Sequence, residues 1–253
     1  MKGVWGPVEL SVGETTHRQI RRLRLWIRRE AERWLYASDL VDGAGVETVV
    51  SRARKASELP WQSILGVGRT EVRLEPALPD KPVLLKAQKP VQVLPDGVLS
   101  LVVAVPVWAR LEAGVTIFEA ESEPMLRTWF GDAQAGESAY AMEIEDWMVG
   151  STPGKGAAHV HVPLKIRNES QSLLSFQRLL VRVVHLSIYG EDSILFTNDV
   201  SVTFRSVTQY SQISFSNKSS LDGGGGRLLQ EPREKVSDNL IRRSFLFFRG
   251  LTE

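Results

Sequence analysis

The clearest pattern in the chain is an alternation of apolar and polar side chains between residues 157 and 205. In its first segment the apolar positions share one parity, and they are Val160, Val162, Leu164 and Ile166. This period of two is that of a strand with one buried face. Turn-forming residues at 168–172 and 189–192 separate this segment from two further apolar stretches. Three strands with short connections make a sheet, and because its apolar face needs a second layer, we expect a β-sandwich.

A second β-rich region extends from residue 72 to residue 115, where prolines and a Pro95-Asp96-Gly97 turn interrupt short apolar stretches. Prolines at strand starts and edges, with turns at close spacing, are typical of a sandwich rather than of alternating strands and helices. We therefore predict an all-β protein of β-sandwich architecture, with two sandwich-like units and little helix. Residues 70–148 would form the first unit, and residues 159–253 the second, closed by a C-terminal strand. Residues 1–69 would hold an arginine-rich hairpin or helix and a connection.

Residues 16–37 fit two patterns. A helical stripe would contain Ile20, Leu23, Ile27, Ala31 and Trp34. A β-hairpin would instead use the alternation around Leu25 and Trp34, with a turn at the polar residues 29–32. Helix propensity favours the first interpretation. We favour the hairpin, because the break in the alternation falls where a turn is needed and the rest of the chain is β-rich.

The same segment is rich in arginine. One interpretation is a patch that binds an anion or a partner, formed by Arg21, Arg22, Arg24, Arg28 and Arg29. The alternative, which we favour, is a solvated face whose long side chains cover apolar surface. The formal net charge of the whole chain is only +1, so there is no global field that would attract nucleic acid, and we expect no nucleic-acid partner.

The composition excludes several classes of site. The chain has 253 residues, 43% of them hydrophobic, which is enough to bury a core. It has no cysteine, which excludes disulfides, thiolate metal sites and a cysteine nucleophile. The sequence shows neither a signal-peptide pattern nor an apolar stretch long enough to span a bilayer. We therefore expect a soluble cytoplasmic protein with no transmembrane segment.

Three histidines suggest one possible metal site. His159 and His161 are two positions apart on a predicted strand, so both rings would project from one face, and His185 is the candidate third ligand. This arrangement would suit a metal-dependent enzyme. Against it, Lys165 and Arg167 share the same face, and no carboxylate lies at an obvious fixed offset. We therefore interpret the histidines as solvent-facing strand residues, and we expect no cofactor.

The best candidate site is a dense group of aromatic, glycine and acidic residues between positions 129 and 140. Its candidate ligand-binding side chains are Trp129, Phe130, Asp132, Glu137 and Tyr140. Exposed rings beside carboxylates are typical of carbohydrate-binding faces and peptide-binding grooves. Asp132 and Glu137 could also act as acid and base in a saccharide hydrolase, which requires a defined carboxylate separation. The structural alternative places Trp129 and Phe130 in the core, and the sequence leaves it open.

Several segments together resemble a known family. They are PDKPVLLKAQKPVQVLPDG, VPVWARL, TWFGDAQAGESAYAM, VPLKIRNES and HLSIYG, which span about residues 70–205. They resemble an uncharacterised bacterial and archaeal family classed only as a domain of unknown function, and the segment from Trp129 to Tyr140 is the most specific part. Genes for some members of that family are expected near those of mechanosensitive channel proteins, so the resemblance implies a membrane-linked regulatory partner. It assigns no catalytic residue, and we expect a non-catalytic binding or protein-interaction module.

Overall fold

The computed structural model describes residues 4–42, 48–51, 59–64, 71–131, 133–134, 136–144, 147–149, 156–191, 194–206, 211–223, 226–236, 239–242 and 244–245. Regular structure in these ranges is β, apart from one turn of 3₁₀-helix at Val183–His185. The all-β prediction is therefore confirmed. In these ranges there is also no helix with the length and apolar character needed to cross a bilayer.

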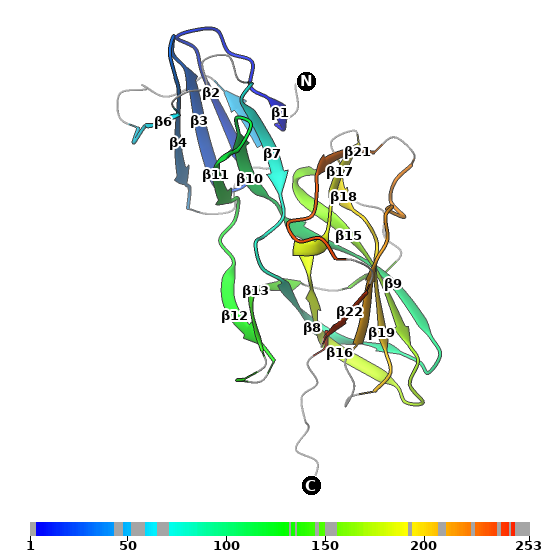
Figure 1. The fold of residues 1–253 in the computed structure, drawn as a ribbon. Coiled ribbons are helices and arrows are strands. Elements are labelled where there is room, and N and C mark those ends of the chain that lie inside the picture. The colour runs from blue at the N-terminus through cyan, green and yellow to red at the C-terminus, as the bar shows by residue number, and fades with distance from the viewer. Residues whose placement is uncertain are drawn as a thin grey trace.

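The N-terminal sandwich packs a five-stranded sheet against a four-stranded sheet (Figure 1). The five-stranded sheet has the order β5 (Thr48–Ser51), β2 (Thr15–Ile20), β3 (Leu23–Arg29), β4 (Trp34–Leu40) and β6 (Gln62–Ile64). The four-stranded sheet has the order β1 (Gly6–Pro7), β7 (Arg73–Ala77), β10 (Trp108–Glu112) and β11 (Thr116–Glu121). The inner faces share an apolar core, in which the ring centroids of Tyr36 on β4 and Phe118 on β11 lie 5.2 Å apart.

The C-terminal sandwich packs a second four-stranded sheet against a nine-stranded sheet. The smaller sheet has the order β12 (Leu126–Phe130), β13 (Glu137–Ile144), β8 (Val83–Val93) and β16 (Leu174–Val181). The main path of the larger sheet is β21 (Arg227–Gln230), β17 (Ile188–Glu191), β18 (Ile194–Thr197), β15 (Gly156–Asn168), β19 (Val200–Phe204), β20 (Ser211–Phe215) and β22 (Asn239–Arg242). Two further strands join it, because β9 (Val98–Pro106) pairs with β15 and β14 (Met148–Val149) pairs with β9. Phe176 and Phe204, from opposite sheets, both pack against Phe245.

Neither sandwich is formed by one continuous stretch of chain. β7, β10 and β11 belong to the N-terminal sandwich, whereas β8, β9, β12 and β13 belong to the C-terminal one, so the chain passes between them three times (Figure 1). β8 pairs with β16 and β9 pairs with β15. Strand pairing therefore joins the ranges 70–148 and 159–253, which the sequence analysis treated as separate units. The range 1–69 supplies a whole sheet of the first sandwich rather than a hairpin and a connection alone.

Residues 16–37 are strands, so the hairpin interpretation is confirmed over the helical one. β3 pairs with β2 on one side and with β4 on the other, and the turn between β3 and β4 falls at the polar residues expected. Leu25 and Ile27 face the core with 0% exposure. The tight turn between β2 and β3 was not predicted, and it places Arg21 at a positive φ of 51°.

Candidate functional site

The predicted site lies on the β12–β13 hairpin, at one edge of the smaller C-terminal sheet. Among the described residues, β12 pairs with β13 alone, and Figure 1 shows this hairpin extending to one side of the molecule. Thr128 stands opposite Ala139 in the pairing, and the side chains of β12 alternate between two faces. Arg127 and Trp129 lie on one face, and Leu126 and Phe130 lie on the other.

The face that carries Phe130 has a small apolar core of its own. Phe130 is 1% exposed and packs with Leu84, Ala139 and Leu180 in a cluster separate from the main core. Leu126 belongs to the same face of β12 but is 75% exposed. The structural alternative considered for Phe130 is thus what the structure shows, whereas Leu126 on the same face is exposed to solvent.

Trp129 lies on the opposite face of β12, and 53% of its surface is exposed. It stands opposite Ser138 on β13, next to the pair formed by Arg127 and Tyr140. Phe130 and Tyr140 are both buried, so the predicted rings do not form one exposed aromatic face. Of the predicted site residues that the structure describes, Trp129 is the exposed one, and Leu126 and Arg127 on the same strand are exposed as well.

Tyr140 is buried, and its contacts hold the β12–β13 hairpin in place. Its hydroxyl donates a hydrogen bond of 2.8 Å to Oδ1 of Asp80, which lies in the connection between β7 and β8. Its ring meets Trp108 edge-on, with 5.9 Å between centroids. Burial, followed by the hydrogen bond and charge of Asp80, raises the pKa of Tyr140 to about 12. These contacts attach β13 to the junction between the two sandwiches.

Glu137 forms an ion pair with Arg182, whose side chain is 4% exposed. This pair fastens the start of β13 to the chain that follows β16. Asp132, the second carboxylate of the proposed hydrolase, lies outside the described residues, so the carboxylate separation that such an enzyme requires is not defined. The hydrolase alternative therefore gains no support from the structure.

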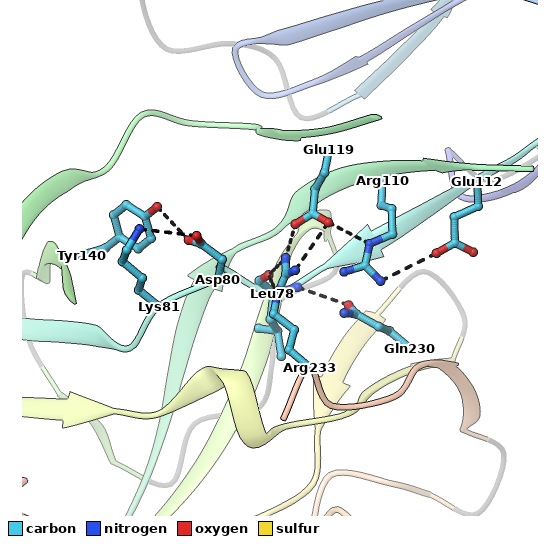
Figure 2. A network of polar contacts seen from close by, with 9 residues as sticks. All are labelled: Leu78, Asp80, Lys81, Arg110, Glu112, Glu119, Tyr140, Gln230 and Arg233. Carbon is cyan, nitrogen blue, oxygen red and sulfur yellow. Dashed lines mark hydrogen bonds and ion pairs between the residues drawn. The ribbon is translucent and has the colours of Figure 1, made fainter. Parts of the chain in front are cut away.

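The junction between the sandwiches is held by a polar network centred on Arg233 (Figure 2). The guanidinium of Arg233 pairs with Glu119 on β11 and donates from Nε to the Leu78 carbonyl over 2.9 Å. Arg110 on β10 also binds Glu119, with 2.9 Å between Nε and Oε2. Gln230 accepts a hydrogen bond of 3.2 Å from the Leu78 amide. The segment around residue 230 thereby fixes both β11 and the connection that leads to β8.

The short segment between β11 and β12 is fixed as well. The Ser122 carbonyl accepts a hydrogen bond of 3.0 Å from the Arg22 amide, and Glu121 accepts one of 3.1 Å from the Met125 amide. Arg21 pairs with Glu123 at 2.6 Å. Since both ends of this connection are bonded to neighbouring elements, β12 is held in a defined position as it leaves the junction.

Each arginine of the predicted patch has a partner within the chain. The contacts join Arg21 to Glu123, Arg22 to Asp42, Arg24 to Asp39, Arg28 to Glu30, and Arg29 to the Leu10 carbonyl. Arg24 and Arg29 also lie over the rings of Trp26 and Trp34. Four of the five guanidinium groups are therefore paired with a carboxylate, and the long side chains of Arg24 and Arg29 cover aromatic surface.

The three candidate metal-ligating histidines have separate environments. His161 is buried, His159 lies 3.4 Å from Nη1 of Arg21, and the His185 ring lies 3.0 Å from the Glu234 carbonyl. Across the described ranges, no group of three or more histidine, aspartate or glutamate side chains is suited to hold a metal ion. His185 instead lines an open cavity of about 380 Å³ with Tyr189 and Asn198. The metal hypothesis therefore gains no support.

Comparison with known proteins gives one match. The family model described as "Protein of unknown function (DUF432)" matches residues 4–249. This confirms the resemblance noted for residues 70–205 and extends it over nearly the whole chain. No curated protein and no solved structure matches.

Proposed function

The chain belongs to this family of unknown function, and on that premise we propose that it is a non-catalytic interaction module, which binds a protein partner along the open edge of β12. The observation that carries this role is the exposure of two large apolar side chains, Leu126 and Trp129, on a strand whose outer edge is unpaired in the described structure. An open edge offers backbone groups to an added strand, and its side chains supply the specificity.

The surroundings of β12 support binding rather than chemistry. Phe130 and Tyr140 are used for packing, and Glu137 is used in an ion pair. Anchoring by the Asp80–Tyr140 hydrogen bond and the Glu119 network holds the edge in place before a partner arrives. Such preorganisation lowers the entropic cost of association.

The proposed role can be tested by placing a photoreactive phenylalanine analogue at position 126. The control is the same analogue at Thr116, an exposed position on the neighbouring edge strand β11. After illumination in native lysate, we expect a specific protein adduct from position 126 and none from position 116. Soluble and membrane fractions are analysed separately by mass spectrometry, because the family resemblance implies a membrane-linked partner such as a mechanosensitive channel. Absence of an adduct at position 126, or equal adducts at both positions, would refute the role.

A further inference from the structure

The occupant of the β12 edge can be inferred from the sequence of the strand itself. This step rests on the proposed function: we propose that β12 pairs in antiparallel fashion with β12 of a second copy of the chain, about a two-fold axis at Thr128. A two-fold axis makes an interface in which each residue contacts the same set of residues on the other copy. Pairing at this edge would join two four-stranded sheets into one continuous sheet.

The register places complementary side chains opposite each other. With Thr128 opposite itself, Arg127 stands opposite Trp129 of the second copy, and Leu126 stands opposite Phe130. Directly opposed side chains in an antiparallel pair have Cβ atoms about 4.5–5.5 Å apart. A guanidinium over an indole ring is a favourable cation–π contact, and two such contacts form because of the symmetry.

The other face of β12 contributes through the exposed side chain of Leu126. Leu126 is 75% exposed in the single chain, on the same face of β12 as Phe130. In the paired arrangement, Leu126 of each copy lies opposite Phe130 of the other, so part of the exposed apolar surface of Leu126 is removed from water. The β12 strand has no acidic residue, so no carboxylate of either β12 stands opposite Leu126 or Phe130 across the dimer.

The shape of the molecule allows this approach. In Figure 1 the β12–β13 hairpin lies at one side of the C-terminal sandwich, and β12 forms its outer side. A contact limited to two five-residue strands is small, at the low end of specific interfaces. We therefore expect a reversible dimer with a dissociation constant on the order of 10 µM.

The chain has no cysteine, so single cysteines can report the register directly. In a dimer centred on position 128, Thr128→Cys places two thiols on the symmetry axis, within the Cα separation of about 4.4–6.8 Å that a disulfide requires. Leu126→Cys places its two thiols several residues apart along the strands, although position 126 is the more exposed. Under mild oxidation we expect a covalent dimer from Thr128→Cys and almost none from Leu126→Cys. Cross-linking of Leu126→Cys at least as fast as Thr128→Cys would overturn the inference.

Sedimentation velocity on the unmodified protein, from about 1 to 200 µM, tests the dimer without mutation. We expect a concentration-dependent shift to the dimer, which Leu126→Glu weakens at least tenfold because it sets a carboxylate against Phe130. The control is Val115→Glu, which alters a similarly exposed apolar residue, 68% exposed, beside β11. It should associate like the unmodified protein, and circular dichroism should show equal folding for both variants.

The outcomes separate this inference from the proposed function. A protein that stays monomeric across the whole range overturns the second copy as occupant. If position 126 still yields a specific adduct with a different protein in lysate, the interaction role stands and only the occupant changes. If the protein is monomeric and position 126 also yields no adduct, both are wrong.

Discussion

β11 and β12 follow each other in the chain, and both are edge strands of four-stranded sheets, yet their edges differ in character. β11 carries Glu119 and Glu121, both bonded to neighbouring groups, and its apolar side chains are partly buried. β12 exposes Leu126 and Trp129. Charged side chains on an edge strand are a common way to prevent that strand from pairing with another chain. The difference indicates that one edge is protected while the other is kept available.

The contrast extends to what fixes each strand. β11 is fastened by Arg110 and Arg233 through Glu119, so its polar side chains are already occupied inside the molecule. β12 is held in place by the burial of Phe130 on one of its faces and by Tyr140 on the neighbouring strand β13, which is bonded to Asp80. Its outer side chains can therefore change at little cost, whereas a change at Glu119 on β11 removes contacts that hold the junction.

The largest effect is expected within β12 itself. Phe130→Ala removes a ring that is 1% exposed and leaves a cavity in the small core, so we expect a loss of about 3–5 kcal/mol in the free energy of unfolding. Trp129→Ala, at the preceding position, should lower the free energy of unfolding by less than about 1 kcal/mol, because Trp129 is already about half exposed. Urea denaturation of both variants measures the difference. Equal losses would mean that β12 has no distinct buried and open faces.

The protected edge should depend on Glu119. Glu119→Ala leaves two guanidinium groups without their shared carboxylate, and the side chains of Glu119 and Arg233 are only 17% and 19% exposed. Breaking a fully buried ion pair costs about 3–5 kcal/mol. This one is partly exposed, so we expect a loss of about 2 kcal/mol. Thr116→Ala, an exposed change on the same strand, is the control and should lose about 0.5 kcal/mol or less.

The association of the Glu119→Ala variant gives a second readout. In sedimentation velocity this variant should still associate, because β12 keeps its side chains, but more weakly than the unmodified chain, because its edge is less preorganised. A Glu119→Ala protein that is as stable as the unmodified chain would show that the network does not hold the junction.

The local pattern of the sequence was sufficient to predict strands. Alternation in segments such as Val160 to Ile166, and around Leu25, depends only on neighbouring residues, so the all-β class and the hairpin at 16–37 could be read from it. The same alternation in β12 separates Arg127 and Trp129 from Leu126 and Phe130. It does not say which face another layer covers, and for that reason the sequence left Phe130 open.

Pairing between distant strands could not be predicted in the same way. β8 pairs with β16, and β9 pairs with β15, across the boundary expected near residues 145–158. Partner choice depends on the packing of whole sheets, which no local period encodes. Arg233 and Glu119 are 114 positions apart, and nothing near either residue signals the other. The sequence therefore singled out the segment that bears the candidate site, but not the hairpin that it forms or the contacts that hold it.

The smallest effect concerns Tyr140, which attaches the hairpin of the open edge to the junction. Its pKa of about 12 in the folded protein lies above the usual value of 10.0, chiefly because burial disfavours the tyrosinate. Between these values the folded chain keeps a proton that the unfolded chain releases. The contribution of Tyr140 to stability is thus fully present below pH 10 and is lost as the pH rises towards 12.

Tyr140→Phe should cost about 1 kcal/mol at neutral pH, the value of the hydrogen bond to Asp80. It should also make the fall in stability above pH 10 shallower than in the unmodified chain, as measured by urea denaturation at pH 9, 10 and 11. The chain has four tyrosines, and in this variant absorbance at 295 nm should lose a component that titrates near pH 12. If the component that disappears titrates near pH 10 instead, Tyr140 is in contact with water, and the hairpin is held at the junction by the Glu119 network rather than by its own anchor.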